Sequence, residues 1–296
     1  MSVTQRIAVT GASGLIGTAL VGHLKSEGHT VQRLVRRSPK SADEIKWDPK
    51  TGYVDIDSLQ GVDAVIHLAG VGVGDKRWTK KYKSEILNSR LLGTTAIANA
   101  VAQVKPQVFI SASAIGWYGD SGNRAVIESD SVGNDFLAAV CREWEAAADL
   151  AVGVRTVKLR TGLVLDPTGG ALARMLPLFR FGLGGKLGSG KQWWSWITLH
   201  DVVRAITFAL EKNISGPVNL TSPNPVTNQE FTSTLARVMK RPALFPAPAF
   251  ALKIALGGFS SEVLGSKKVM PNVLTDAGFE WDYPQISTAL KALIED

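Results

Sequence analysis

The stretch Arg6–Gly17, which reads RIAVTGASGLIG, decides the fold of this 296-residue chain. Its first five residues, Arg6–Thr10, form a β-rich run, and apolar residues then recur at helical spacing from Leu15 to Leu24. Three glycines separate the two patterns. A glycine motif is informative when it directly follows a strand and opens a helix, as it does here. The stretch therefore predicts a strand, a tight turn and a helix.

Each glycine of the turn has its own structural task. Gly11 permits the tight turn, Gly14 lets the backbone approach a pyrophosphate, and Gly17 lets the helix pack close to the sheet. The free N–H groups and partial positive charge of a helix N-terminus then attract the anion. The turn is therefore expected to hold the pyrophosphate of a nucleotide cofactor. The alternative interpretation is a tight turn that binds no ligand.

Strand and helix signals alternate through the rest of the first half. The strand candidates are Thr30–Val35, Lys46–Asp48, Val62–Leu68, Val108–Ser111 and Thr156–Leu159, and the longer helix candidates are Tyr82–Val104 and Phe136–Leu150. The Val62–Leu68 run (VDAVIHL) is typical of a strand that is covered on both faces. This alternation predicts an α/β fold: a Rossmann-type, doubly wound parallel sheet with helices on both sides.

The composition changes after about residue 166, where glycine and proline become frequent. Such a stretch predicts loops and short helices that wall a binding cleft. A helix (Asp201–Glu211), a strand (Pro217–Leu220) and a helix (Thr227–Met239) follow. We expect a cofactor-binding Rossmann domain over residues 1–165 and a smaller substrate-side region over 166–296, partly interleaved with it.

Composition excludes several classes of protein. Apolar residues make up 45% of the chain and charged residues 20%, as in soluble globular proteins. One cysteine, Cys141, allows neither a disulfide framework nor a cysteine-based zinc site, and we see no metal-ligand cluster. The net charge of +7 fits either a basic surface or an anionic ligand, and no aromatic and basic ladder supports nucleic-acid binding. With no signal peptide or long apolar run, we expect a cytoplasmic protein that does not enter a membrane.

The residue after the second strand predicts the choice of cofactor. An acidic residue there selects NAD, whereas an arginine accommodates the 2′-phosphate of NADP. The chain reads Leu34-Val35-Arg36-Arg37, and Arg36 stands nineteen residues beyond Gly17. NADP is therefore the expected cofactor, and two solvated arginines at a strand end are the alternative.

At this point the sequence resembles the extended short-chain dehydrogenase/reductase superfamily. Thr10–Gly17 matches the fingerprint TGxxGxIG. The later matches are His67-Leu68-Ala69-Gly70 to the segment beside the adenine, Gly93-Thr94 to the following helix, and Ser111-Ala112-Ser113 with Tyr118-Gly119 to the segment after the next strand. Together these motifs cover residues 6 to 165.

The resemblance sharpens toward one branch, the NADP-binding epimerase-like family with a C-terminal domain of unknown function. The matching segments are Ser89-Arg90-Leu91, Trp144-Glu145, Arg160-Thr161-Gly162, Gly169-Gly170-Ala171, Gly188–Ile197 and Pro271–Phe279. Members are described as nucleoside-diphosphate-sugar epimerases. The resemblance implies cofactor contacts along the whole glycine turn, at Gly11, Ala12, Ser13, Gly14, Leu15, Ile16 and Gly17. Beyond the turn it implies contacts at Arg36, Leu68, Ala69, Glu85, Arg90 and Val164. A surface salt pair is the alternative for Glu85 and Arg90, although their spacing of five suits it poorly.

The superfamily's catalytic YxxxK pair is absent. Aligned on Glu145, the chain has Leu137 in place of the tyrosine and Cys141 in place of the lysine. The resemblance leaves Ser113 and Tyr118 as the catalytic candidates. Ala114 is the alternative occupant of the Ser/Thr position, because the count to Tyr118 is one residue long, and packing at the strand end is the alternative role of Tyr118. We expect Cys141 to be a buried, inert thiol, because a free cysteine is usually a core residue. Three tryptophans, Trp193, Trp194 and Trp196, either line the substrate cleft or pack in the core.

Two functions fit these observations. The first is an NADP-dependent oxidoreductase or epimerase acting on a nucleotide sugar or another small carbonyl or hydroxyl compound, with an altered proton-transfer system. The second is a non-catalytic NADP-binding sensor or regulatory protein. Either would bind a small molecule and no nucleic acid, and a homodimer is compatible with both.

Overall fold

A mostly parallel sheet of eight strands forms the centre of the computed structural model, which describes residues 4–295. Its strands are β1 (Arg6–Thr10), β2 (Thr30–Val35), β3 (Glu44–Asp48), β4 (Tyr53–Val54), β5 (Ala64–His67), β6 (Val108–Ala114), β8 (Arg155–Thr161) and β12 (Gly216–Leu220). Their order across the sheet is β12-β8-β6-β5-β1-β2-β3-β4, and only β4 is antiparallel to its neighbour. The strand order therefore reverses between β1 and β5, which is where a doubly wound sheet opens a crevice for ligands.

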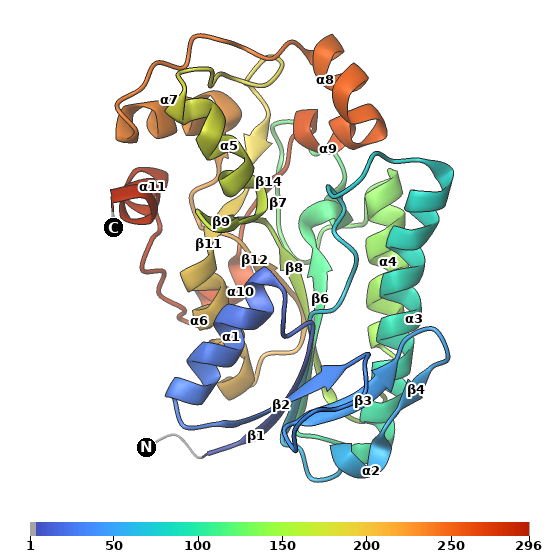
Figure 1. The fold of residues 1–296 in the computed structure, drawn as a ribbon. Helices are drawn as coiled ribbons and strands as arrows, with labels where there is room; N and C mark the ends of the chain where they lie inside the picture. The colour runs from blue at the N-terminus through green and yellow to red at the C-terminus, as the bar shows by residue number, and fades with distance from the viewer. Residues whose placement is uncertain (1–3, 296) are drawn as a thin grey trace.

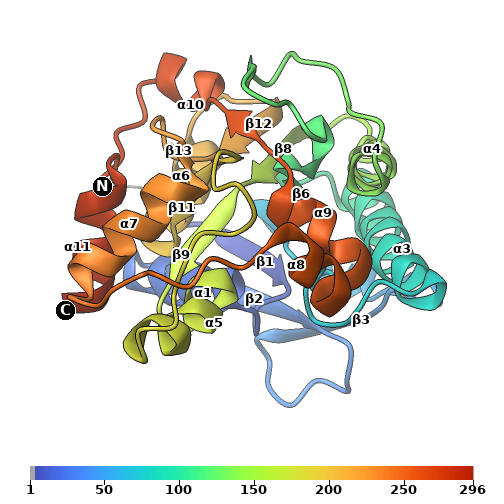
Figure 2. The ribbon, with the colours of Figure 1, turned by 90° about the horizontal axis from the view of Figure 1, so that it is seen from above.

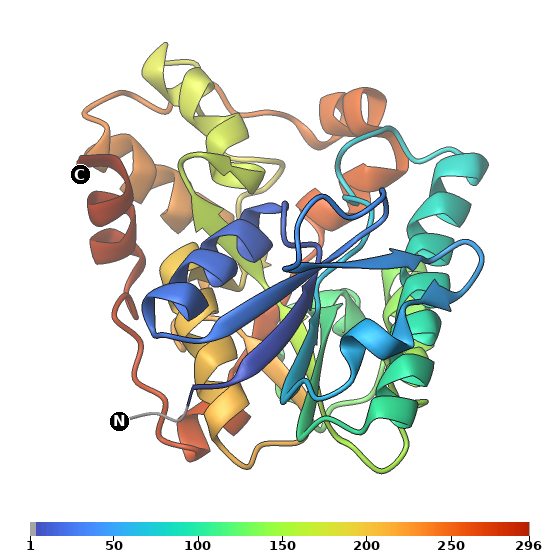
Figure 3. The same ribbon diagram turned by 60° about the horizontal axis from the view of Figure 1, so that its bottom comes forward.

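Helices cover both faces of this sheet. The helices α1 (Leu15–Ser26) and α6 (Leu199–Glu211) lie on one side, and α3 (Lys80–Val104) and α4 (Phe136–Ala148) lie on the other (Figure 1). Alternate strand residues point to opposite faces, so Ile7 and Val9 pack toward α1 and α6 while Ala8 packs toward α3. Figure 3 shows β1 and β2 running between these two helical layers. The predicted fold class is confirmed.

Side-chain caps start most of the long helices. Thr79, Asp135, Thr198 and Thr227 each accept a hydrogen bond from the backbone N–H three residues ahead, at the starts of α3, α4, α6 and α7 (Asn228–Val238). Such caps satisfy donors that a helix leaves free in its first turn. The helix α1 begins without one.

The C-terminal half builds a smaller layer above the carboxyl ends of the strands. Its elements are α5 (Gly170–Arg180), α7, α8 (Ala249–Leu256), α9 (Ser260–Leu264), α11 (Ile286–Glu295), the 3-10 turn η2 (Gly257–Phe259) and the strand pairs β9 (Leu163–Asp166) with β11 (Trp196–Thr198) and β10 (Trp193–Trp194) with β13 (Val226–Thr227). The helix α10 (Asn272–Asp276) packs instead against β12 and the core of the main sheet, and β14 (Lys268–Val269) pairs with β7 (Ala125–Val126) from the first half of the chain. Seen from above, α5, α7 and α11 lie on one side and α8 and α9 on the other (Figure 2). A separate apolar core joins α5, α7 and α11.

The two halves are interleaved. After α5 and the short strands, the chain returns to the main sheet with α6 and β12, and then leaves it again for α7. The Gly/Pro-rich region after residue 166 was expected to form loops and short helices. It contains the 11-residue helix α5, with Pro177 inside it. Within the described residues, no helix is both long and apolar enough to cross a membrane.

Candidate functional site

The glycine turn lies tightly against the end of β5. Gly11 has a φ of +66°, and a Cβ atom there would lie 2.8 Å from the carbonyl carbon of Leu68. A Cβ atom on Gly17 would lie 2.1 Å from the Gly11 carbonyl oxygen. Neither position has space for a side chain, so only glycine permits this path of the chain.

The N-terminus of α1 is free to bind an anion. Its N-cap residue is Gly14, no side chain caps it, and no acidic residue stands in its first turn. Its first N–H groups therefore point outward with the positive end of the helix dipole. A cavity of about 340 Å³ opens beside them, and its lining residues are Ser13, Gly14, Leu15, Thr18, Ala19, Thr168 and Leu199. These features fit the pyrophosphate of a dinucleotide.

Thr10 joins the ends of β1 and β5 behind the turn. Its Oγ1 accepts hydrogen bonds from the N–H groups of Leu68 (3.1 Å) and Ala69 (3.3 Å). The same hydroxyl must therefore donate to Nδ1 of His67, 2.7 Å away. Burial lowers the pKa of His67 to about 3, so its ring is neutral and carries its proton on Nε2. His67 has a structural role here: its ring accepts from the Thr10 hydroxyl. That hydroxyl in turn orders the backbone at Leu68 and Ala69, two of the expected cofactor contacts.

The two arginines after β2 differ in what they contact. Arg37 donates two hydrogen bonds to Glu44, of 2.7 and 2.5 Å, and this lowers the pKa of Glu44 to about 2. Arg36 is exposed, and its guanidinium has no hydrogen-bond or ion-pair partner in the described part of the chain. Because Arg37 is engaged, Arg36 is the arginine available to a phosphate at the end of β2.

Arg90 and Glu85 do not pair with each other. The Arg90 guanidinium stacks on the Trp144 ring at 4.7 Å and donates to the carbonyl oxygens of Val71 (2.9 Å) and Ile86 (3.2 Å). Burial lowers the pKa of Arg90. Glu85 is exposed, and its ion-pair partner is Lys76 at 3.8 Å. The salt-pair interpretation is therefore wrong, and Arg90 holds the segment that follows β5.

Val164 approaches the glycine turn from the opposite half of the chain. It pairs with Ile197 between β9 and β11, and it packs against the same core as Ala12, Ile16 and Leu68. The segment after β9 also meets this turn, since a Cβ atom on Gly169 would lie 2.8 Å from Leu15 Cδ1. The structure thus brings together the glycine turn, Leu68, Ala69 and Val164. Their cofactor contacts stay predictions.

The two catalytic candidates both lie in a buried polar network. Ser113 donates to Glu145 at 2.7 Å. The Tyr118 hydroxyl donates to Asn219 at 2.7 Å and accepts from Arg160 at 3.0 Å. Burial raises the pKa of Tyr118 to about 12 although Arg160 acts in the opposite direction. Both hydroxyls are nearly inaccessible to solvent and already bonded, as a structural role requires.

Arg160 is the centre of this network, and sequence reasoning gave it no role. It makes a two-pronged ion pair with Glu145, at 2.8 and 3.0 Å, and stacks 3.9 Å from the Trp117 ring centroid. It also donates to the backbone oxygen of Glu128. Arg160 and Glu145 were visible only as members of two family motifs. The network connects the main sheet, α4 and the C-terminal segment, because Asn219 also donates to the Met270 carbonyl.

The inner face of α4 holds no group that exchanges a proton near neutral pH. A Cβ atom on Gly116 would meet Leu137 Cβ at 3.2 Å and Cys141 Sγ at 3.5 Å. Cys141 is buried and its thiol donates to the Ala114 carbonyl at 3.6 Å. Burial, followed by the charge of Glu145, raises the pKa of Cys141 to about 12. The predicted burial of this thiol is confirmed, and its lack of reactivity stays a prediction.

The tryptophans divide between core and surface. Trp196 is fully buried, and its indole N–H donates to the Asn224 carbonyl. Trp194 packs against Phe231, with the ring centroids 5.3 Å apart. The cleft-lining interpretation is therefore wrong for Trp196. Trp193 is half-buried beneath Lys268, whose Nζ lies 4.2 Å from the ring centroid.

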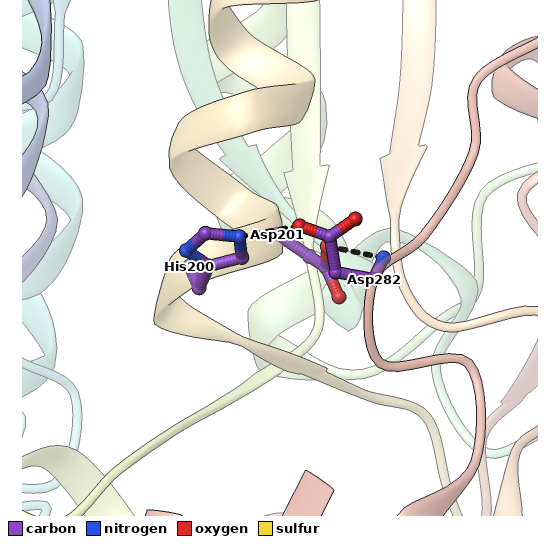
Figure 4. Close-up of side chains that lie close together, drawn as sticks. All are labelled: His200, Asp201 and Asp282. Carbon is purple, nitrogen blue, oxygen red and sulfur yellow. Dashed lines mark hydrogen bonds and ion pairs between the residues drawn. The ribbon is translucent and has the colours of Figure 1, made fainter. Parts of the chain in front are cut away.

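One group of side chains in residues 4–295 has the spacing of a metal site: His200, Asp201 and Asp282 (Figure 4). Its ligand atoms are already bonded. His200 Nε2 pairs with Asp282 at 2.6 Å, the backbone N–H groups of Asp282 and Tyr283 donate to Asp201, and Arg204 pairs with both carboxylates at 3.1 Å. These bonds hold the C-terminal segment against the start of α6, and the positive charge of Arg204 offsets the negative charge of the two carboxylates.

Comparison with known families agrees with this geometry. The model of the NAD dependent epimerase/dehydratase family matches residues 7–221, and a domain of unknown function (DUF1731) matches residues 247–293. The second match assigns residues 247–293 to a domain family that has no described activity.

Relatives cover nearly the whole chain. The Epimerase family protein Mb2239 of Mycobacterium bovis is 45% identical, and the match covers 96% of each chain. The crystal structure of the human epimerase family protein SDR39U1 (isoform 2) with NADPH matches at a TM-score of 0.91 and 32% identity, covering 98% of this chain and 99% of the human one. A structure described as the nucleoside-diphosphate sugar epimerase of Corynebacterium glutamicum matches at 0.81 and 34%, covering 99% of this chain and 59% of that one.

Proposed function

Because the chain belongs to the NAD dependent epimerase/dehydratase family, we propose that it binds NADP(H) and acts as an oxidoreductase or epimerase. The proposed substrate class is a nucleotide sugar or another small carbonyl or hydroxyl compound. The observation that carries the choice of cofactor is the exposed Arg36 directly after β2, whose guanidinium has no partner among residues 4–295, whereas Arg37 is held by Glu44. The human relative that was solved with NADPH supports the same choice.

The residues around the turn have separate tasks in holding this cofactor. The N–H groups at the start of α1 would bind the pyrophosphate, and Gly14 would admit it closely. Arg36 would pair with the 2′-phosphate. Arg90 fixes the segment after β5, beside Leu68 and Ala69. Bound NADP(H) supplies hydride-transfer chemistry next to the cleft between the two halves of the chain.

Ser113 and Tyr118 are our candidates for handling the proton that accompanies such a transfer. Each would have to exchange its present partner, Glu145 or Asn219, for the substrate. With a pKa raised to about 12, Tyr118 can donate a proton at neutral pH but does not act as a base there. We propose that Tyr118 donates a proton to a developing alkoxide of the substrate.

A second candidate function is a non-catalytic NADP(H) sensor. The observation that favours it is the inner face of α4, where Leu137 and Cys141 pack against Gly116. These two residues stand where the resemblance expects the proton-transferring pair, and neither can exchange a proton at neutral pH. The two functions share the cofactor site and differ only in turnover.

The cofactor part is tested by calorimetry with NADPH and NADH on three proteins: the wild type, Arg36→Ala and Arg37→Ala. We expect the wild type to bind NADPH more tightly than NADH. Arg36→Ala should reduce the difference in binding free energy between the two cofactors by about 1–3 kcal/mol, the size of a charge-assisted contact. The matched Arg37→Ala variant should keep the preference, because Arg37 is engaged with Glu44. Equal affinities in the wild type would refute the proposal.

The enzyme and the sensor are separated by two assays. Simple carbonyl compounds are incubated with the protein and 4-deuterated NADPH, and the label is sought in the product alcohol. Nucleotide sugars, which carry no carbonyl to accept a hydride, are incubated with the protein and NADP⁺, and the epimer or the oxidised sugar is sought by NMR. Either product supports the enzyme. Full cofactor affinity with no product in either assay supports the sensor.

A further inference from the structure

A second cavity lies in the C-terminal layer, away from the glycine turn. Its volume is about 770 Å³, within the range of small-molecule sites. Its lining residues are Lys186, Gln229, Thr232, Ser233, Ala236, Arg237, Lys240, Arg241, Pro242, Ala243, Leu244 and Pro246. It has no lining residue in common with the cavity beside α1, and none of the expected cofactor contacts belongs to it.

One face of α7 forms the wall of this cavity. The α7 residues at positions 229, 232, 233, 236 and 237 recur at the spacing of a single helical face, and Lys240 follows two residues after the helix ends at Val238. The opposite wall comes from residues 241–246, which form a backbone ladder with the loop after α5: the Phe245 and Ala247 N–H groups donate to Gly184 and Lys186. The walls are therefore held by regular backbone bonds on both sides.

The charge of the cavity is positive. Lys186, Arg237, Lys240 and Arg241 line it, and no carboxylate does. None of these four cations forms an ion pair with any residue between positions 4 and 295. Clustered cations without counter-charges repel one another, so an anion placed among them gains favourable interactions with all four.

Neutral hydrogen-bond donors accompany the cations. Gln229 and Ser233 line the cavity from the same face of α7. Thr232 also lines it, but its Oγ1 is shielded from solvent, so a ligand in the open cavity contacts the rest of that side chain and not the hydroxyl.

We propose that this cavity binds an organic phosphate, a molecule with an anionic phosphate group and an apolar or aromatic body. The four cations recognise the phosphate, with Gln229 and Ser233 as neutral donors. The remaining lining side chains are apolar, at Ala236, Pro242, Ala243, Leu244 and Pro246, and they contact the body. Inorganic phosphate alone would leave that apolar wall uncovered. The site is separate from the proposed NADP(H) site and does not depend on it.

The test is calorimetry on protein saturated with NADPH, with 2-naphthyl phosphate as the probe. Inorganic phosphate and 2-naphthol serve as its anionic and apolar halves. We expect the naphthyl phosphate to bind about tenfold more tightly than either half, because both walls are engaged. If 2-naphthol binds equally well, or no probe binds, the proposal is overturned.

Lys240→Gly is the variant that best separates an effect on ligand binding from an effect on stability. Lys240 has a φ of +52°, a conformation that glycine adopts without strain, so this change should preserve or raise the melting temperature. It should nevertheless weaken naphthyl phosphate binding about fivefold. Arg237→Gln removes a second lining cation at an exposed position of α7 and should weaken binding by a similar factor. The matched control is Arg142→Ala, an exposed cation on α4 whose ion-pair partner among residues 4–295 is its neighbour Glu143. Unchanged affinity in both Lys240→Gly and Arg237→Gln would contradict the assignment of the site.

Discussion

Replacing Glu145 by glutamine should destabilise the protein by about 3–5 kcal/mol, the usual result of breaking a buried ion pair from one side. The Glu145 carboxylate accepts three hydrogen bonds, two from Arg160 and one from Ser113. Arg160 is 2% exposed, so water cannot replace the lost partner. Glutamine has nearly the same size, and the change therefore removes charge and one acceptor without opening a cavity. Urea unfolding at 25 °C, followed by tryptophan fluorescence, measures the free energy of unfolding.

The control lies two residues away on the same helix. Glu143 is exposed and pairs only with Arg142, so Glu143→Gln should cost less than about 0.5 kcal/mol. The double variant Glu145→Gln/Arg160→Met should recover part of the loss, since removing both charges relieves the unpaired one. A loss below about 1 kcal/mol in Glu145→Gln, or no recovery in the double variant, would refute the view that this pair is the centre of the buried network.

Three further predictions concern the thiol, the C-terminal segment and acid stability. Cys141→Ser should keep NADPH affinity, and the wild-type thiol should resist disulfide reagents at pH 8, because its pKa is raised to about 12; rapid labelling of the native protein would contradict this. Deleting the chain from Val269 onward should lower the melting temperature, since Val269 is fully buried and β14 pairs with β7; a truncated protein with the full melting temperature would show a detachable module. The lowered pKa of Glu44, about 2, means that its bond with Arg37 stabilises the fold above the ordinary glutamate pKa and is lost as pH falls toward 2. Glu44→Gln should therefore lower the melting temperature at pH 6, and the difference from the wild type should shrink with acidification; a difference independent of pH would argue against it.

The central sheet was predictable because its strands carry their pattern locally. The residues of β5 are buried on both faces, with Val65 toward α3 and Ile66 toward α1, and the apolar run alone indicated this. The turn at Gly11 was equally clear, because its positive φ and close contact with Leu68 require glycine. Parallel strands joined by helices leave few alternative topologies. The fold class and the place of the cofactor site follow from these local signals.

The rest could not be predicted because it depends on contacts between distant residues. The partners of Arg160 are 15 residues away at Glu145 and 42 residues away at Tyr118, and no periodicity in the sequence records such pairs. The helix α5 was hidden for a different reason: Gly170 at its start and Pro177 inside it are signals for loops. Tertiary packing of its apolar face against α7 and α11 outweighs these local preferences.

The same long-range contacts determine which side chains can transfer a proton to or from a substrate. The resemblance directs attention to two positions on α4, but Leu137 and Cys141 fill the space against Gly116, so no substrate group can reach that face without displacing them. Tyr118 and Ser113 are held by Asn219 and Glu145. If the protein is an enzyme, substrate binding must therefore loosen part of the Arg160 network. Turnover and stability would then be coupled through the same residues, and variants that weaken the network without unfolding the protein would change kcat more than NADPH affinity. A sensor would show no such coupling, because the glycine turn and Arg36 are joined to the sheet independently of Arg160.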